Sequence, residues 1–459
     1  MLQYIIALVV ILGFMGVFVW RPTVGTYIKY TLWTLPFTST KILPLDYGFI
    51  RVFDVLAVTA VLFLFREFVT LRSRRDNLGY VLVIVVFIGL TLLGKFFSAY
   101  PQEKLYMLYP LFTIFIFTRF FIHYLYEDFE RRYELLRILK FGFGLAMLFI
   151  LLQIVIGPSI TYYTEIHNNA KGESFSTTRF PGLFLDSQTN GQFLAMASFL
   201  FLLMPPNAKK LEKYLGYALF GAMGVSVVLA GSRAALGGFL LGCVLFFLMA
   251  KLKTKIVLGT LGIFSVLVIF LAKPNAAIFG RTDNLGEDYN FREAIWEETF
   301  GMIAKHPIWG IGMANYEKYI MTYHQDLNIV IEPGVEYYFF RQPENGYLKI
   351  MVDQGIPAFV LFFAMVAYPL LRSGIGWLNG RVNGEVKYVI CSALAFMVAF
   401  NTVYTLLDYR LACLFTLLIS LALLYSNKGR AQNGIRHHLP ARKEVDKKST
   451  MALGTWPKN

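Results

Sequence analysis

Long apolar runs alternate with short polar connections along nearly the whole chain. Each run approaches the roughly 20 residues that an α-helix needs to cross a bilayer. The pattern predicts an all-α polytopic membrane protein with about twelve membrane-spanning helices. Their predicted bounds are Leu2–Trp20, Gly48–Phe65, Gly79–Ser98, Leu105–Tyr126, Ile138–Ile156, Gly191–Met204, Leu215–Ala230, Ala234–Ala250, Ile256–Ala272, Gly346–Leu371, Tyr388–Leu407 and Leu411–Tyr425.

Two segments depart from this pattern. The segment Tyr27–Leu45 is apolar but is interrupted by Pro36 and Pro44, which indicates a re-entrant or interfacial piece. The segment Lys273–Asn345 is the longest polar stretch between two apolar runs, and ordered loops of this length usually carry function. We therefore divide the chain into membrane helices in 1–272, a large loop at 273–345, further helices in 346–426 and a basic tail at 427–459.

Lysines and arginines near the ends of the runs indicate the orientation, because cytoplasmic connections are enriched in them. With twelve spans, the basic connections fall on one side, and they include 66–75, 131–140, 209–213, 251–255 and 372–387. The tail from Asn427 is basic and has no apolar period, so we expect it to be disordered and to contact lipid headgroups rather than nucleic acid. Both termini are then predicted to be cytoplasmic, and the loop 273–345 extracytoplasmic.

The composition agrees with the membrane class and argues against disulfide and metal sites. The chain is 56% hydrophobic and 16% charged, with a net charge of +14. The three cysteines lie in apolar runs and the six histidines have no ligand spacing, so we expect neither a disulfide framework nor a metal site. The loop 273–345 is different, because six cations there face eleven carboxylates. An acidic, aromatic-rich loop on a basic membrane body indicates a folded extracytoplasmic cap.

An amphipathic helix is predicted within this loop, from Asn290 to His306. Asn290 is its expected N-cap, with Glu293 in a capping-box arrangement, and Pro307 ends the helix. An apolar stripe at helical spacing, which includes Trp296, is expected to pack on the membrane domain.

Four arginines lie at connections predicted to be extracytoplasmic. Arg179 precedes a Pro-Gly turn, Arg233 closes a very short hairpin, and Arg281 and Arg292 lie in the large loop. One arginine at a helix end commonly reaches toward lipid headgroups. Four together fit a single anionic headgroup, because arginine binds phosphate bidentately and stays charged.

Four patterns follow one another from the middle of the chain onward. They are RFPGLFLDSQTNGQFLA from Arg179, AGSRAALGGFLLG from Ala230, NFREAIWEETFGMIAKHPIWGIGMANY from Asn290 and PENGYLKIMVDQGIPAFV from Pro343. In this order, and with the large loop between two late spans, they resemble the O-antigen ligase and Wzy-type polymerase family of membrane glycosyltransferases. The resemblance covers residues 179–360 in detail, whereas the first five spans match only in hydropathy.

The resemblance implies transfer of a glycan from a polyprenyl-pyrophosphate carrier to a hydroxyl of a glycan or glycolipid, at the outer face of the bacterial cytoplasmic membrane. It implies an inverting, metal-independent reaction without a cofactor. Arg233, Arg179 and either Arg281 or Arg292 would hold the pyrophosphate. Besides donor, acceptor and membrane lipids, it implies chain-length regulators or flippases as partners, and no nucleic acid.

The fourth pattern departs from the family at Glu344-Asn345, where family ligases commonly have His-Asn. A carboxylate can accept the proton that the acceptor hydroxyl loses, so Glu344 is the candidate base, with Asn345 in support and His306 as a competitor. A structural role for Glu344 is the alternative. The exchange favours a polymerase over a ligase that modifies a lipid A core. A lipid-linked glycan flippase and a non-catalytic scaffold are the other classes that the sequence permits.

Overall fold

The computed structural model describes residues 2–45, 48–70, 75–157, 160, 162, 179–250, 285–323 and 342–438, with isolated positions between 252 and 267. The statements below concern these residues. The α-helices are α1 (Leu2–Trp20), α2 (Val24–Trp33), α3 (Val52–Phe63), α4 (Phe65–Thr70), α5 (Arg75–Phe96), α6 (Tyr109–Glu127), α7 (Arg131–Ile156), α8 (Ser187–Ser198), α9 (Lys210–Leu229), α10 (Arg233–Met249), α12 (Leu285–Lys305), α13 (Tyr316–Tyr323), α14 (Gly346–Leu378), α15 (Val386–Phe400) and α16 (Tyr409–His438). The 3-10 helices are η1 (Leu35–Phe37), η2 (Leu105–Leu108) and η5 (Phe199–Leu202), and the strands are β1 (Lys41–Leu45) and β2 (Gly48–Arg51).

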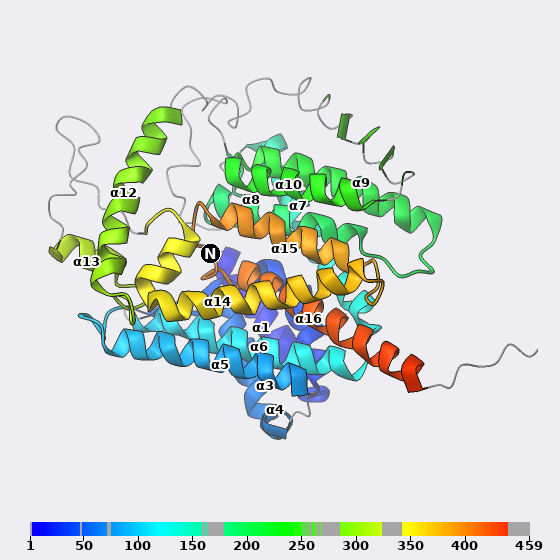
Figure 1. Ribbon diagram of the computed structural model, residues 1–459, viewed down its shortest axis with the longest axis horizontal. Helices are drawn as coiled ribbons and strands as arrows, with labels where there is room; N and C mark the ends of the chain where they lie inside the picture. The colour runs from blue at the N-terminus through cyan, green and yellow to red at the C-terminus, as the bar shows by residue number, and fades with distance from the viewer. Residues whose placement is uncertain are drawn as a thin grey trace, which may run out of the picture.

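Most of the helices form one bundle, and α12 and α13 lie at one end of it (Figure 1). We call this the cap end, and the end at which α16 leaves the bundle the opposite end. Within the described residues, six helices are long and apolar enough to cross a membrane, and α3, α10 and α15 are shorter apolar helices. The all-α membrane class is therefore supported. The number of twelve spans stays a prediction, and the span Ile256–Ala272 lies largely outside the described residues.

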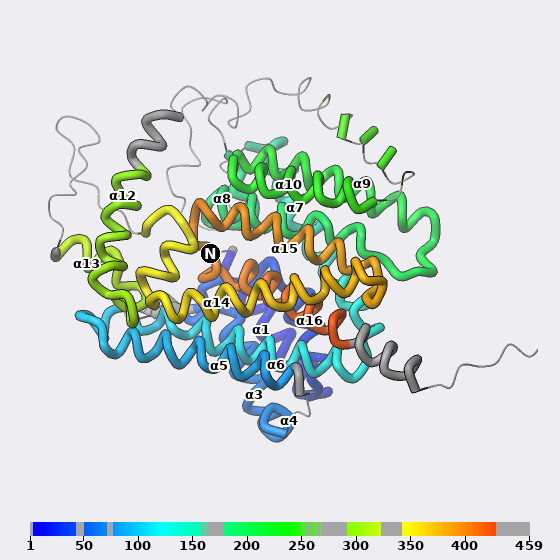
Figure 2. Tube along the Cα trace, viewed as in Figure 1, coloured from blue at the N-terminus to red at the C-terminus, as the bar shows by residue number. Residues whose placement is uncertain are grey.

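Helix α16 is the central helix of the bundle (Figure 2). Of its residues between Tyr409 and Asn427, 94% are buried, and α6, α8, α14 and α15 pack around it. It continues to His438, although we predicted the last span to end at Tyr425 and the tail to be disordered. The sequence between Tyr425 and His438 contains no proline that would stop the helix.

Two glycines of the second pattern allow α10 to approach α15 closely. A Cβ added to Gly238 would lie 2.2 Å from the carbonyl oxygen of Ala395, and one added to Gly242 would lie 3.3 Å from that of Cys391. Small residues four apart let two helix backbones approach in a membrane, where van der Waals packing drives association. The second pattern is thus in part a packing motif.

The segment around α2 crosses the bundle instead of re-entering from one side. It follows α7 from one end to the other. Lys29 Nζ lies 2.5 Å from Glu134 Oε1 in the first turn of α7, and Thr40 Oγ1 lies 2.8 Å from Tyr162 OH beyond its last turn. The segment then turns into the β1–β2 hairpin at the cap end, which the all-α prediction did not include.

This crossing fixes the direction of α1. Its last residues lie beside the end of α3, where the Phe18 and Phe63 rings are 5.8 Å apart, and Arg21 lines the same cavity as Arg131. The neighbouring Arg132 donates to Tyr425 OH (3.2 Å), so this is the opposite end. Leu2 therefore lies toward the cap end. Leu2 and the end of α16 thus lie at opposite ends of the bundle, which differs from the arrangement predicted for the two termini, because that prediction counted no crossing between Arg21 and Tyr47. The side of each terminus stays a prediction.

Helix α14 is broken at Gly355, whose φ is +83°. Pro357 lacks the N–H that would bond to the carbonyl of Asp353, so this carbonyl is left without its helical partner. Residues 307–312 of the cap supply the missing partners. Gly312 N donates to Asp353 O (3.0 Å), Ile311 N donates to Val352 O (2.8 Å), and Ile356 N donates to Pro307 O (2.8 Å). The cap is therefore docked by backbone hydrogen bonds.

The cap has a small core of its own that includes the start of α14. Met302 and Ile303 from α12 and Tyr316, Tyr319 and Ile320 from α13 pack against Leu348 and Val352 of α14. Trp296 lies at the edge of this core, as its place in the apolar stripe predicted. The helix begins at Leu285, so Asn290 lies inside it, and the prediction that Asn290 caps the helix is wrong.

The direction of α1 leads to a labelling prediction. In a variant without the three native cysteines, Arg21→Cys should react with a membrane-impermeant maleimide only when the cytoplasmic face is exposed, as should the control Arg131→Cys. The reason is that Arg21 lies at the basic, opposite end. Labelling of Arg21→Cys from outside intact cells would contradict the crossing at α2.

The break in α14 leads to a second prediction. Gly355→Ala should loosen the cap by roughly 1–3 kcal/mol, the usual cost of a strained backbone position, since the new Cβ would lie 2.0 Å from Ile308 O. Amide hydrogen exchange at Ile311 and Ile356 should accelerate while the bundle stays protected. The control is Gly301→Ala, where a Cβ meets nothing within 4 Å. Equal protection in both variants would show that the cap does not depend on this contact.

Candidate active site

The connection between α15 and α16 joins the first and fourth patterns at the cap end. Gln192, in α8, donates through Nε2 to Ala399 O (3.1 Å) and accepts from Thr405 Oγ1 (2.6 Å). Asn345, just before α14, donates through Nδ2 to Asn401 Oδ1 (3.0 Å). Segments that lie far apart in the sequence thus meet at the end of α15.

The first and second patterns also lie side by side. Phe180 N donates to Leu229 O (3.4 Å), and a Cβ on Gly191 would lie 2.8 Å from Ser232 Cβ. Arg179 and Arg233 therefore belong to neighbouring segments. Arg233 is half-buried at the first position of α10, where the helix dipole disfavours a cation. An anion beside it would be attracted by the guanidinium and by the positive end of the helix dipole.

The third and fourth patterns meet at Glu344. Trp296 Nε1 of α12 donates to Pro343 O (3.0 Å), and Asn345 caps α14 by accepting from the backbone N–H of Tyr347 (2.9 Å) and Leu348 (3.2 Å). Between these fixed neighbours, Glu344 has a φ of +48°. A non-glycine residue in this left-handed region costs of order 1–3 kcal/mol, and such strain is common at functional sites.

Burial dominates the electrostatics of Glu344. Burial raises the pKa of its carboxyl above the ordinary value, the guanidinium of Arg292 lowers it, and the carboxylate of Asp186 raises it again. The net effect is a raised pKa. The guanidinium of Arg292 favours the ionised form, but desolvation is the larger effect. A carboxylate with a raised pKa is a stronger base when ionised.

Two residues near this site were missed in the sequence. Asp186 is the N-cap of α8, where it accepts from the backbone N–H of Thr189 (2.7 Å). The other is Arg410, which is fully buried. It binds Asp408 (Nη2 to Oδ2, 2.5 Å) and Leu183 O (2.5 Å), so it ties the first pattern to the start of α16.

Sequence signals for these two residues differ in strength. The spacing of Asp186 before Thr189 is an N-cap signal, which was available. For Arg410 the only signal is an opposite charge two positions away. Burial alone would raise the pKa of Asp408, but the ion pair with Arg410 outweighs burial and lowers it.

The remaining candidates are less central. His306 Nε2 is 2.9 Å from Tyr319 OH within the cap core, and burial, with Lys305, lowers its pKa. It lies about 15 Å along α12 from Trp296, given 1.5 Å of rise per residue. Arg281 lies outside the described residues. Among the described side chains, no group of three or more His, Cys, Asp or Glu is arranged to hold a metal ion.

Comparison with known proteins bears on the assignment. Residues 218–363 match the family model described as O-Antigen ligase. The matched region contains the second, third and fourth patterns and ends inside α14, whereas the first pattern precedes it. No curated protein matches the chain. The family match confirms the resemblance, and residues 218–363 of this membrane protein belong to the O-antigen ligase family.

Proposed function

We propose that the protein is a membrane glycosyltransferase that moves a glycan from a polyprenyl-pyrophosphate carrier to a hydroxyl of a glycan acceptor, at the outer face of the bacterial cytoplasmic membrane. The observation that carries this proposal is the meeting of all four patterns at the cap end, around the strained Glu344. Three helices, α8, α10 and α14, begin there, so their positive dipole ends support an anionic headgroup.

In the proposed reaction Glu344 is the base. The acceptor hydroxyl transfers its proton to the Glu344 carboxylate while its oxygen attacks the anomeric carbon from the face opposite the leaving group. The bond from that carbon to the phosphate oxygen breaks, and pyrophosphate leaves with the electron pair, which inverts the configuration. Arg233, Arg179 and Arg292 stabilise the growing charge, at about 3 kcal/mol for a well-placed donor. No metal or cofactor takes part in this scheme.

Transfer to another lipid-linked glycan, as in a polymerase, is our first choice for the acceptor, and transfer to a lipid A core is the second. The glutamate at the position of the family histidine favours the polymerase. A flippase is the competing function, and transporters tend to have ionisable groups near the middle of the membrane. Lys95 does not fit that role, because it donates to Met313 O (3.0 Å) and Asn315 Oδ1 (2.5 Å) at the cap junction.

The proposal can be tested with purified protein in vesicles that contain a polyprenyl-pyrophosphate oligosaccharide. A product of higher mass supports the polymerase. Transfer that occurs only when a lipid A core is added supports the ligase. Movement of the donor across the vesicle without a product indicates a flippase, and no change in the donor overturns all three activities.

Arg233→Lys is predicted to lower turnover about tenfold or more, because lysine keeps the charge but loses the planar fork that binds phosphate. Protein level and thermal stability should stay near wild type. The control is Arg381→Lys, an exposed arginine near the opposite end, which should remain fully active. Wild-type turnover in Arg233→Lys would mean that this arginine only contacts lipid headgroups.

Glu344→Gln is predicted to lower turnover about 100-fold or more, the usual contribution of a general base, with donor binding largely unchanged. In the wild type, activity should fall on the acid side at a pH above about 4.3, the ordinary glutamate pKa, because the raised pKa protonates the base earlier as the pH falls. This fall in activity, the acid limb of the pH–rate profile, should be absent from the residual activity of Glu344→Gln.

The matched control for this variant is Glu293→Gln, an exposed carboxylate beside Arg292, which should keep both the rate and the acid limb. If Glu344→Gln turns over donor at the wild-type rate across roughly pH 4–9, the range of ordinary Glu and His titration, Glu344 is structural. Catalysis would then rest on the arginines or on His306.

A further inference from the structure

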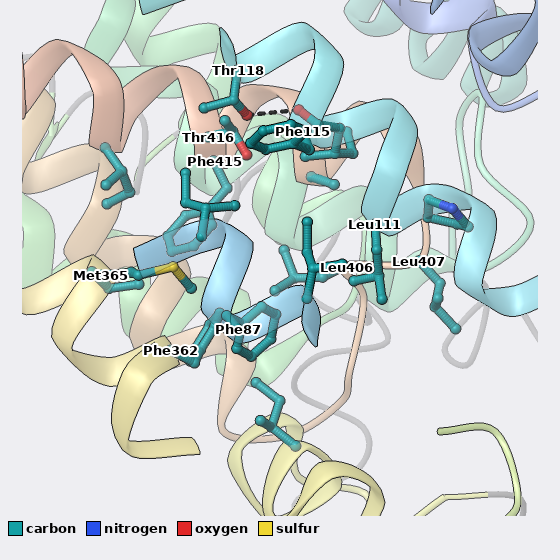
Figure 3. Close-up of a pocket in the computed structure, with 18 of the residues that line it drawn as sticks. Phe87, Leu111, Phe115, Thr118, Phe362, Met365, Leu406, Leu407, Phe415 and Thr416 are labelled. Atoms are coloured by element: carbon teal, nitrogen blue, oxygen red, sulfur yellow. Dashed lines mark hydrogen bonds between the residues drawn. The ribbon is translucent and has the colours of Figure 1, made fainter. Parts of the chain in front are cut away.

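A polar cavity lies at the opposite end of the bundle, where the connection from α1 to α2 meets the corner of α3 and α4 and the connection from α6 to α7. Its volume is about 760 Å³, within the roughly 300–1,000 Å³ typical of small-ligand sites. It differs from the apolar cavity between α5, α6, α14 and α16, because none of the described residues that line that cavity is charged (Figure 3). The charged lining residues of the polar cavity are three cations and three carboxylates, namely Arg21, Lys29, Arg131, Glu67, Glu127 and Glu134.

Four of these six charges compensate one another in pairs. Lys29 Nζ lies 2.5 Å from Glu134 Oε1, which joins α2 to α7. Arg131 Nη1 lies 3.0 Å from Glu127 Oε2, across the connection from α6 to α7. These four side chains therefore form the walls of the cavity and leave no net charge for a ligand.

Arg21 and Glu67 are the remaining two charges. Both are exposed, and neither has an ion pair with a described residue. Arg21 lies just before the first turn of α2, whose N-cap is Thr23, so the positive end of the helix dipole adds to the guanidinium in attracting an anion. The cavity thus presents one uncompensated cation and one uncompensated carboxylate, and a ligand that matches both carries a phosphate and an ammonium group.

The aromatic lining of the cavity indicates which kind of ammonium group fits. A quaternary ammonium is bound by the open faces of aromatic rings, whereas a primary ammonium donates hydrogen bonds to carboxylates. Tyr124 is the one aromatic residue among the described residues that line the cavity. The guanidinium of Arg131 lies 4.6 Å from the centre of its ring, and a Cβ on Gly25 would lie 2.9 Å from its Cε2 atom. Because the Tyr124 ring is already covered, the free carboxylate of Glu67 favours a primary ammonium.

The cavity lies at the level of a membrane surface. Three of the candidate membrane spans end or begin beside it, at Trp20, Glu127 and Arg131. Trp20 is 81% exposed, and exposed tryptophans are typical of the membrane–water interface. Phe65, two residues before Glu67, is 61% exposed. Apolar surface for acyl chains therefore adjoins the charged cavity.

We propose that this cavity binds the headgroup of a phosphoethanolamine lipid from the leaflet at the opposite end, which we predict to be the cytoplasmic leaflet. The phosphate binds Arg21 and the start of α2, the ammonium donates to Glu67, and the acyl chains lie along the surface beside Trp20 and Phe65. Such a lipid links the α1–α2 connection to α4 and so stabilises the entry into the crossing at α2. The inference is independent of the proposed function, because the cavity lies at the end of the bundle away from Glu344.

The test is lipid binding to the full-length protein in detergent, measured by native mass spectrometry. Phosphatidylethanolamine, phosphatidylcholine and phosphatidylglycerol with identical acyl chains are compared, so only the headgroup differs. Phosphatidylethanolamine should bind about tenfold or more tightly than either of the other two, as expected for a hydrogen bond between charged groups. Equal binding of the three lipids, or a preference of the wild type for phosphatidylglycerol, would overturn the inference.

Two variants test the two ends of the headgroup separately. Arg21→Gln should weaken the binding of phosphatidylethanolamine about tenfold or more, through loss of the phosphate contact. Glu67→Gln should reverse the preference toward phosphatidylglycerol, because the site then keeps a cation without a carboxylate. Both residues are exposed, so both variants should unfold at the wild-type temperature in the absence of lipid.

The matched controls are Arg381→Gln and Glu297→Gln, which remove exposed charges elsewhere and should bind phosphatidylethanolamine as the wild type does. Unchanged binding in both Arg21→Gln and Glu67→Gln would show that the lipid does not occupy this cavity. Displacement of the lipid by an equal concentration of soluble glycerophosphoethanolamine would identify a soluble ligand and overturn the assignment to a lipid.

Discussion

The break in α14 is the constraint on which the rest of the cap end depends. Within a membrane domain, backbone polar groups need partners inside the protein, because the bilayer core offers no water. Pro357 and Gly355 interrupt the helix. Backbone groups of the cap segment 307–312 make the hydrogen bonds that the interrupted helix cannot make within itself. This exchange docks α12 on the first half of α14, and α12 in turn brings Trp296 to Pro343 and Arg292 near Glu344.

A second consequence concerns how the site is built. The chain places its chemically interesting groups at the ends of well-packed helices, and irregular backbone is confined to connections that other segments cover. Gln192, Asn345 and Thr405 satisfy the polar ends of α15 and its connection, and Arg410 with Asp408 links the first pattern to the central helix. A rigid frame of this kind suits preorganised donors, which stabilise charge at the reacting centre without further rearrangement.

The sequence predicted the membrane class, most helices and the family patterns, because these follow from apolar length and local spacing. It missed the crossing at α2, since this helix is short, carries Lys29 and is followed by Pro36 in η1, so it does not reach the length of a span. It also misplaced the start of α12, because the capping signals at Asn290 are local and the helix begins at Leu285. The bond from Arg410 to Leu183 O joins segments more than two hundred residues apart, and no local pattern reports it. Glu344 was proposed from its position in the pattern, but the effect of burial on its pKa required the structure.

The central claim is that the four patterns surround one donor headgroup. An experimental structure with a bound, non-transferable polyprenyl-pyrophosphate glycan analogue tests this most directly. The account predicts the two phosphates at the cap end, between the first turn of α10 and Glu344, with the anomeric carbon nearest Glu344. Phosphate density at the opposite end, or on the outer surface of the cap away from α8, α10 and α14, would contradict it.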